Sequence, residues 1–155
     1  MNTKIEIRDV PKMNLAFVMS IGDPGLAGAY TKLINWMNSN KVNENENTKM
    51  MTIYHDNFKN TEPGNVRASA CVILSEPIDV SGEGIDLKTN QGGKCIVGSF
   101  EIHPDDFEQS WKSLYLWMRE NGYKKSTQNP FELYHNNFTE HPDKKCLVEF
   151  YIPID

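Results

Sequence analysis

A long internal repeat is the feature that most restricts how this chain can fold. Residues 53–58, Ile-Tyr-His-Asp-Asn-Phe, return 80 positions later as Leu-Tyr-His-Asn-Asn-Phe at 133–138, and Trp36-Met37 returns 81 positions later as Trp117-Met118. Solenoid repeats are shorter and more numerous, so this pattern indicates two copies of one supersecondary unit. We therefore expect one domain, 1–155, built from halves at about 4–78 and 85–154 with a cleft where they meet.

Each half is predicted to contain one amphipathic helix. The apolar residues of both segments follow the helical steps 0, 4, 7, 8 and 11, and each position in the second segment equals the first plus 81. These positions are Leu26, Tyr30, Leu33, Ile34 and Met37 in the first helix, and Phe107, Trp111, Leu114, Tyr115 and Met118 in the second. Asp23 and Pro24 are expected to begin the first helix, and Asn121-Gly122 to end the second.

Strand signals lie on both sides of each helix. They are found at 4–8, 15–19, 51–54 and 68–74 in the first half, and at 85–89, 94–101, 131–134 and 146–152 in the second. Each half therefore has the order strand, strand, helix, strand, strand. The short connections predict an α+β fold, with an antiparallel or mixed sheet that carries both helices on one side.

Composition argues against several classes of function. The net charge is −5 and the 16 basic residues are scattered, which disfavours a nucleic-acid surface. Cys71, Cys95 and Cys146 form no Cys-x-x-Cys pair, so they indicate neither disulfides nor a metal site and fit small core residues. There is no nucleotide-binding or serine-hydrolase motif, transmembrane stretch or signal peptide. We expect a cytoplasmic protein without a cofactor or membrane contact.

Acids and aromatics alternate with apolar residues in the last two strands. If the helix covers the apolar face of each strand, Glu132 and Tyr134 share the opposite face with Glu149 and Tyr151. A carboxylate among aromatic rings attracts a hydrophobic cation, with cation–π contacts of about 0.5–2 kcal/mol each. A desolvated Glu would also have a raised pKa, which suits general acid or base catalysis. The alternative interpretation is that both Glu side chains face water.

The two halves differ at these acids. Thr52 stands where the second half has Glu132, and an alignment on the prolines after the last strands places Ile73 opposite Glu149. Only the second half is acidic, so the mismatched positions are the first candidates for function.

The neighbouring aromatic and histidine residues allow two interpretations. Tyr54 and Tyr134 are either packing partners in the core or walls of the cleft, and Trp111 lies on the apolar stripe of its helix. His55 and His135 follow the repeated Tyr and have no second ligand at metal spacing, so we interpret them as structural or exposed.

Together these motifs resemble the GyrI-like family. This family includes the DNA gyrase inhibitory protein and is related to the effector-binding domains of AraC-type and MerR-type multidrug-sensing regulators. The resemblance rests on Trp36-Met37, on residues 53–57 and 131–137, and on Val-Glu-Phe-Tyr-Ile-Pro-Ile at 148–154. It spans about Ile5 to Ile154, nearly the whole chain. No helix-turn-helix is expected ahead of the domain, because the first residues already read as a strand.

The resemblance implies a stand-alone domain that binds amphipathic, cationic small molecules or toxins in a central cleft. The residues implied for the ligand site are Glu149, Glu132, Tyr54, Tyr134, Tyr151 and Trp111. Two alternatives stay open: a hydrolase that opens cyclopropane-type toxins with Glu149 or Glu132, and a gyrase inhibitor that binds gyrase or a regulator. The sequence favours a binding protein over an enzyme. Ser69 stands where the family has an acidic residue after Arg67, which weakens any function that depends on that acid.

Overall fold

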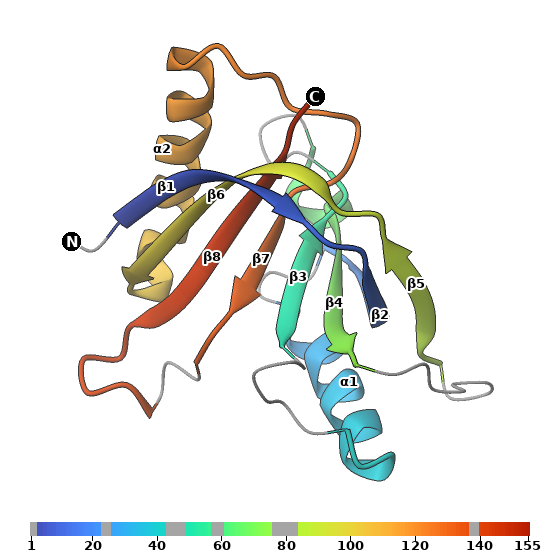
Figure 1. Cartoon of the computed structure of the whole chain (residues 1–155). Coiled ribbons are helices and arrows are strands. Elements are labelled where there is room, and N and C mark those ends of the chain that lie inside the picture. Colours follow the sequence, from blue (N-terminus) through green and yellow to red (C-terminus); the bar gives the residue numbers. More distant parts are fainter. Residues whose placement is uncertain (1–2, 23–25, 43–48, 57–60, 76–83, 137–139) are drawn as a thin grey trace. The chain divides into compact units, whose positions relative to one another are not determined.

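The computed structural model describes residues 3–22, 26–42, 49–56, 61–75, 84–136 and 140–155 (Figure 1). Within these ranges the chain forms eight strands and two α-helices, and the strand pairings inside each unit are antiparallel. The strands are β1 (Thr3–Val10), β2 (Met13–Ile21), β3 (Met50–Tyr54), β4 (Arg67–Leu74), β5 (Asp86–Asn90), β6 (Gly93–Ile102), β7 (Phe131–Tyr134) and β8 (Cys146–Pro153). The helices are α1 (Ala27–Ser39) and α2 (Phe107–Glu120). The predicted α+β class is confirmed.

Element boundaries follow the sequence pattern closely. β7 spans the expected residues 131–134, and α2 ends with Asn121 as its cap. Gly122 follows with a φ of 75°, a left-handed conformation that glycine adopts at little cost after a helix. The expected cap Asp23 and the expected first helical residue Pro24 of α1 lie outside the described residues.

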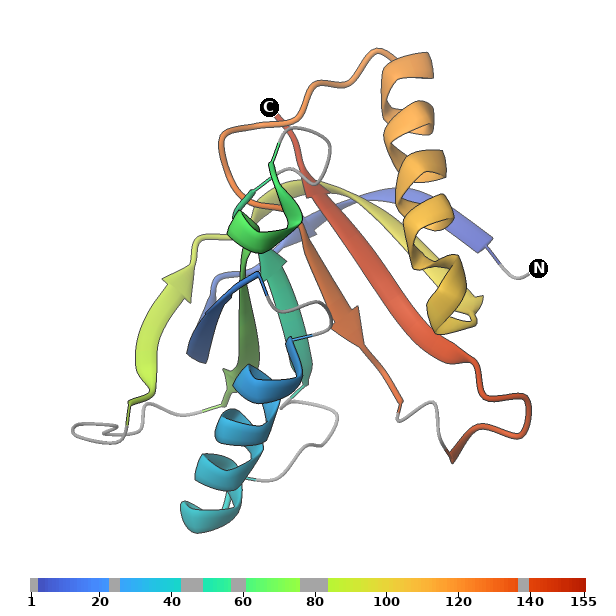
Figure 2. The same cartoon turned by 180° about the vertical axis from the view of Figure 1, so that it is seen from behind.

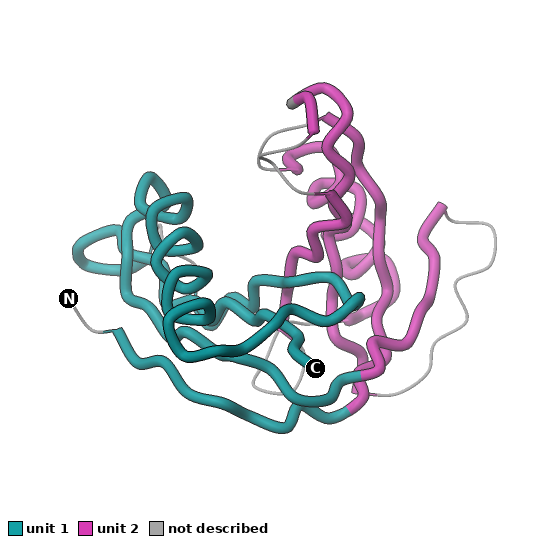
Figure 3. Tube along the Cα trace, turned by 90° about the horizontal axis from the view of Figure 1, so that it is seen from above, with its two compact units in different colours: residues 1–11, 92–155 teal, residues 12–91 magenta. Residues whose placement is uncertain are grey.

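The chain divides into two compact units, which Figure 3 colours separately. Unit 1 comprises Met1–Pro11 and Gly92–Asp155, and unit 2 comprises Lys12–Gln91. The strand order is β1-β6-β8-β7 in unit 1 and β5-β2-β4-β3 in unit 2. The first strand of each sequence repeat therefore belongs to the unit that the other repeat mainly forms. The expected cleft between the halves and the placement of both helices on one side of the sheet stay predictions.

The duplication extends to the register of strand pairing. Leu133 pairs with Glu149 in unit 1, and Ile53 pairs with Ser69 in unit 2, which is an offset of 80 on both strands. The counterpart of Glu149 is therefore Ser69, and the expected correspondence with Ile73 is wrong. The prolines used for that alignment were not equivalent, because β8 extends to Pro153 whereas β4 already ends at Leu74.

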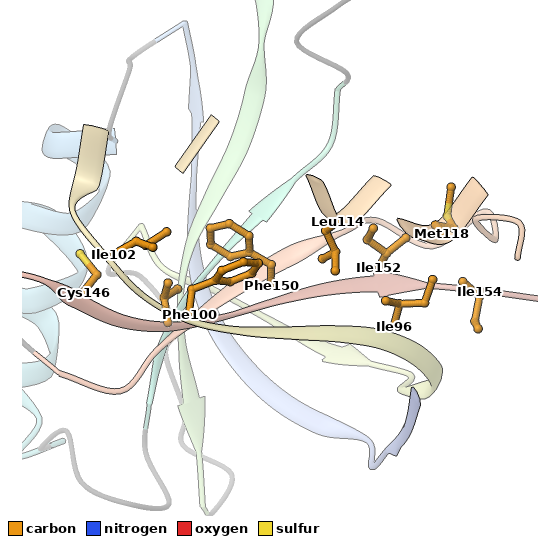
Figure 4. Close-up of a cluster of buried hydrophobic side chains, with 10 residues drawn as sticks. Ile96, Phe100, Ile102, Leu114, Met118, Cys146, Phe150, Ile152 and Ile154 are labelled. Carbon is orange, nitrogen blue, oxygen red and sulfur yellow. The ribbon is translucent and has the colours of Figure 1, made fainter. Parts of the chain in front are cut away.

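In unit 1, α2 packs on the face of the sheet that is nearer the viewer in Figure 2. The core beneath α2 consists of Ile96, Phe100, Ile102, Leu114, Met118, Cys146, Val148, Phe150, Ile152 and Ile154 (Figure 4). Gly98 lies on the same face, where an added Cβ would be 2.7 Å from the Phe100 ring and 3.0 Å from Leu114. The missing side chain at Gly98 therefore lets α2 approach the sheet closely.

In unit 2, α1 contacts β2 and β4. Leu33, Trp36 and Met37 of α1 are buried, and in unit 1 Trp117 packs against the core beneath α2. Both tryptophans of the repeated Trp-Met pair thus pack against the core of their unit.

The three cysteines are buried and unpaired, which confirms their interpretation as small core residues. Burial raises the pKa of the Cys71 thiol to about 12 and that of Cys95 to about 11. No helix in the described ranges is long and apolar enough to cross a membrane.

Candidate functional site

Glu132 lies on the α2 side of the unit 1 sheet. It pairs with Phe150, a residue of the core beneath α2, and directly paired residues of antiparallel strands share a face. Its carboxylate accepts hydrogen bonds from Trp111 Nε1 at 2.8 Å and from the Tyr134 hydroxyl at 2.6 Å. The Glu132 residue is only 2% exposed. The result is a buried carboxylate held by two aromatic donors.

The positions of these donors follow from local structure. Tyr134 is two residues beyond Glu132 on β7 and therefore points to the same face. Trp111 projects from α2 and stacks on the ring of Phe150, with centroids 4.4 Å apart and planes 2° from parallel. Tyr115, one helical turn later, contacts the Trp111 ring. Packing thus fixes the indole whose N–H reaches Glu132.

Unit 2 contains the same helix-to-strand contact without the charge. The Tyr30 hydroxyl lies 2.6 Å from Thr52 Oγ1 and donates to the Met51 carbonyl at 2.9 Å. Tyr30 is the counterpart of Trp111, and Thr52 is the counterpart of Glu132. Where the two halves differ, unit 2 therefore has a neutral hydroxyl pair, Tyr30 with Thr52, and unit 1 has an indole–carboxylate pair, Trp111 with Glu132.

Glu149 lies on the opposite face of the sheet from Glu132. It pairs with Leu133 on β7 and with Ser99 on β6, whereas Glu132 pairs with Phe150. The expected common face for both acids is therefore wrong. The reason is the register of β7 on β8. The apolar residues of β7, Phe131 and Leu133, face away from α2, and a shift of the pairing by one residue would reverse the face of every side chain.

Hydrogen-bond donors from β1, β6, β8 and the residue after β7 surround the Glu149 carboxylate. It accepts hydrogen bonds from Arg8 Nη1 at 2.6 Å, His135 Nε2 at 2.7 Å, the Tyr151 hydroxyl at 3.0 Å and Ser99 Oγ at 3.4 Å. Burial by itself would raise the pKa of Glu149, but the bonds from His135, Arg8 and Tyr151 outweigh burial and lower it to about 2. Glu149 is thus an ionised group whose charge is compensated inside unit 1.

Sequence reasoning missed both Arg8 and His135 as partners of Glu149. Arg8 reaches the carboxylate from β1, which the exchanged strand arrangement brings into unit 1. The sequence signal for His135 was its match with His55 in the repeat. The structure has the equivalent contact in unit 2, where His55 Nε2 lies 2.8 Å from Ser69 Oγ. The interpretation of both histidines as structural is consistent with these contacts.

An open hollow of about 520 Å³ lies beside Glu149 in unit 1. Its lining includes Lys4, Ser99, Glu101, His135 and Glu149. Glu132 does not line this hollow, so the two acids differ in surroundings as well as in face.

The structure divides the predicted site residues into three sets. Trp111, Glu132 and Tyr134 come together beneath α2, whereas Tyr151 joins Glu149 on the other face and stacks on Phe131. Tyr54 belongs to unit 2, on β3. Within the described ranges, no group of three or more His, Cys, Asp and Glu side chains is arranged to hold a metal ion.

Comparison with known proteins gives relatives that cover nearly the whole chain. A protein of Dickeya dadantii (strain 3937) named DNA gyrase inhibitor 2 is 23% identical over 136 residues, which are 86% of this chain and 85% of that protein. The C-terminal domain of EcmrR has a TM-score of 0.77 at 18% identity, covering 100% of this chain and 99% of that domain. The chain spans 57% of the EcmrR chain in a complex with DNA.

A further similar structure contains a ligand. SAV2435 bound to tetraphenylphosphonium has a TM-score of 0.63 at 13% identity, covering 98% of this chain and 94% of that one. At these identities the solved structures show a shared fold. The model of one family, described as the GyrI-like small molecule binding domain, matches residues 3–155. The chain therefore belongs to the GyrI-like small-molecule-binding domain family.

Proposed function

We propose that this domain binds amphipathic organic cations and that Glu132 is their charge partner. The observation that carries the proposal is the buried Glu132 carboxylate, bonded to Trp111 at 2.8 Å and to Tyr134 at 2.6 Å. A negative charge enclosed by aromatic rings complements a ligand that is both apolar and positively charged.

The attraction is expected to be strong because the carboxylate is shielded from water. Two unit charges 4 Å apart attract by about 4 kcal/mol at an effective dielectric of about 20, compared with about 1 kcal/mol in water. The Tyr134 ring would add a cation–π contact of about 0.5–2 kcal/mol, whereas one face of Trp111 is already stacked on Phe150. Charge and aromatic surface therefore act on the same part of the ligand.

Access to Glu132 requires a local rearrangement. Because Glu132 is 2% exposed, a neighbouring side chain must move before a ligand can contact the carboxylate. Tyr134 is the simpler candidate, because it is the last residue of β7. Trp111 is held more firmly by its stacking on Phe150. A bound cation would then take the place of the Tyr134 hydroxyl as a partner of Glu132.

Glu149 fits this role less well. Its charge is already balanced by the Arg8 guanidinium, and four hydrogen bonds occupy both of its carboxylate oxygens. A ligand cation would have to compete with Arg8 for the same oxygens. We therefore assign Glu149 to the stability of unit 1 and Glu132 to the ligand.

The comparisons support the general class of function. The family is a small-molecule-binding one, and SAV2435 has been solved with tetraphenylphosphonium, an aromatic cation. That ligand has the combination of charge and apolar surface to which the Glu132 cluster is complementary.

Calorimetric titration with tetraphenylphosphonium tests the proposal. We expect binding to the unmodified protein and at least about tenfold weaker binding to Glu132→Gln, which corresponds to 1.4 kcal/mol or more. Glu149→Gln removes a carboxylate on the opposite face of the same sheet and is the comparison variant, once circular dichroism shows that it is folded. Triphenylphosphine oxide, a neutral aromatic probe, should bind Glu132→Gln and the unmodified protein equally.

If Glu149→Gln weakens tetraphenylphosphonium binding while Glu132→Gln leaves it unchanged, the cation site is on the other face. A neutral probe that binds as tightly as the cation would show that charge has no role.

A second candidate function is hydrolysis of strained-ring compounds. The buried carboxyl of Glu132, 2.6 Å from the Tyr134 hydroxyl, is a pairing suited to general acid–base catalysis. In such a reaction Glu132 would take a proton from water as the water oxygen bonds to one ring carbon and the ring bond at that carbon breaks. The carbon that keeps the electron pair would take a proton from the Tyr134 hydroxyl, which Glu132 then reprotonates. Mass spectrometry after incubation with a cyclopropane-containing substrate would detect a product heavier by one water. Only unchanged substrate would exclude this activity for the compounds tested.

A further inference from the structure

β1 forms a long edge of the unit 1 sheet. All eight of its residues pair with β6, and no described residue pairs with its outer side. Strands in globular proteins commonly have about 5–6 residues, and a long free edge can template pairing with another strand.

The ladder determines which backbone groups of β1 point outward. Ile154 N donates to Lys94 O, so Lys94 directs its backbone groups to β8, and the next residue, Cys95, directs its groups to β1. Pro153, which has no N–H, stands opposite Cys95, as this alternation requires. Cys95 pairs with Arg8, so the even-numbered residues of β1 bond inward. The odd-numbered residues 3, 5, 7 and 9 have outward groups.

The side chains of β1 alternate in character. Ile5 and Ile7 are partly buried and pack against the core beneath α2. Lys4, Glu6 and Arg8 lie on the other face, where Glu6 is bridged to Lys4 at 3.4 Å and to Arg8. Between Thr3 and Asp9 the edge thus presents Ile5 and Ile7 on one face and charges of alternating sign on the other.

We propose that two copies of this chain join through antiparallel pairing of their β1 strands, with Ile5 on the two-fold axis. In this register Ile5 meets Ile5, Thr3 meets Ile7, and Lys4 meets Glu6 of the second copy. Apolar residues therefore oppose apolar or neutral ones, and opposite charges oppose each other on the charged face.

Neighbouring two-fold registers are less favourable. An axis at Glu6 would oppose Glu6 with itself and Lys4 with Arg8, and like charges directly opposite destabilise a sheet. An axis at Ile7 would oppose Ile5 with Asp9. The sequence of β1 therefore favours the register centred on Ile5.

The free edge of unit 2 is a weaker competitor. β5 has five residues and is therefore shorter than β1. Gly22 N donates to Val66 O, so the even-numbered residues of β2 direct their backbone groups to β4. The odd-numbered residues of β2, including Leu15, direct theirs to β5. Lys88 pairs with Leu15, so Leu87 points outward and is 45% exposed. Leu87 is thus the matched position for a control.

Sedimentation equilibrium at physiological salt, with protein up to about 1 mM, tests the proposal. Ile5→Pro removes an outward N–H and no hydrogen bond to β6, so it should weaken dimerisation at least about tenfold. Leu87→Pro makes the same change on the other edge and should leave dimerisation unchanged. Lys4→Glu should weaken it because Glu would oppose Glu6.

A monomeric unmodified protein, or an Ile5→Pro variant that dimerises as tightly, would overturn the proposal. Circular dichroism establishes whether Ile5→Pro is folded. If it is not, Lys4→Glu decides, and an unchanged dimer in that variant also overturns the proposal.

Discussion

Glu149→Gln should remove a large part of the acid sensitivity of this protein. The Glu149 residue is 8% exposed, and its carboxylate is bonded to Arg8, His135 and Tyr151. Glutamine has the same shape but no charge, and its amide nitrogen cannot accept a hydrogen bond from Arg8. The substitution therefore isolates the ionised state of one buried group.

The sign and size of the effect follow from the pKa of Glu149. The folded protein lowers this pKa from 4.5 to about 2. A lowered pKa adds stability that is fully present above pH 4.5 and is lost as the pH falls toward 2. The shift corresponds to at most about 3 kcal/mol at neutral pH, of which about 2 kcal/mol is lost by pH 3. This is an upper limit, because the Arg8 side chain is 36% exposed and screened by water.

Urea unfolding followed by tryptophan fluorescence at pH 7 and pH 3 measures the effect. We expect Glu149→Gln to be less stable than the unmodified protein by up to about 3 kcal/mol at pH 7 and by up to about 1 kcal/mol at pH 3. Glu120→Gln, which replaces an exposed carboxylate at the end of α2, should show no such dependence. If the unmodified protein and Glu149→Gln lose equal stability between the two pH values, the assignment of acid sensitivity to Glu149 is refuted.

Three substitutions and one labelling experiment test the packing. Tyr30→Phe removes the hydroxyl bonds to β3 and should lower the free energy of unfolding by about 1 kcal/mol in urea titrations. Gly22→Ala should lower the free energy of unfolding by about 3 kcal/mol in thermal unfolding, because φ is 69° and the added Cβ would lie 2.5 Å from Gly64 O. Gly122→Ala should lower it by only about 1–2 kcal/mol, because φ is 75° but the space around the added Cβ is open. Cys71, 0% exposed with its pKa raised to about 12, should react with a thiol reagent only after urea unfolding, and rapid labelling of the native protein would contradict its burial.

Local patterns in the sequence were sufficient for the secondary structure. The spacing of apolar residues every three or four positions identified α1 and α2, and Asn121-Gly122 marked the end of α2. The repeat also identified Thr52 and Glu132 as equivalent positions with different chemistry, which the contacts to Tyr30 and Trp111 support. The helical spacings lie within a few residues of one another, and the repeat is a match of the sequence with itself 80 positions later, so a single sequence contains both signals.

The pairing partners of each strand required the tertiary structure. The sequence repeats do not coincide with the compact units, because β1 pairs with β6 and β5 pairs with β2. This exchange brings Arg8 to Glu149, from 141 positions away, and no local pattern connects the two residues.

The sequence by itself thus determined the duplication, the order of strands and helices, the family resemblance and the acids that distinguish the halves. The tertiary structure decided which face each acid occupies: Glu132 beneath α2 among aromatic donors, and Glu149 on the opposite face beside Arg8. The physical reason is that side chains alternate across a strand, so the face of an acid depends on the register between distant strands. A difference of one residue in that register reverses every side chain, and the sequence of one strand does not specify it.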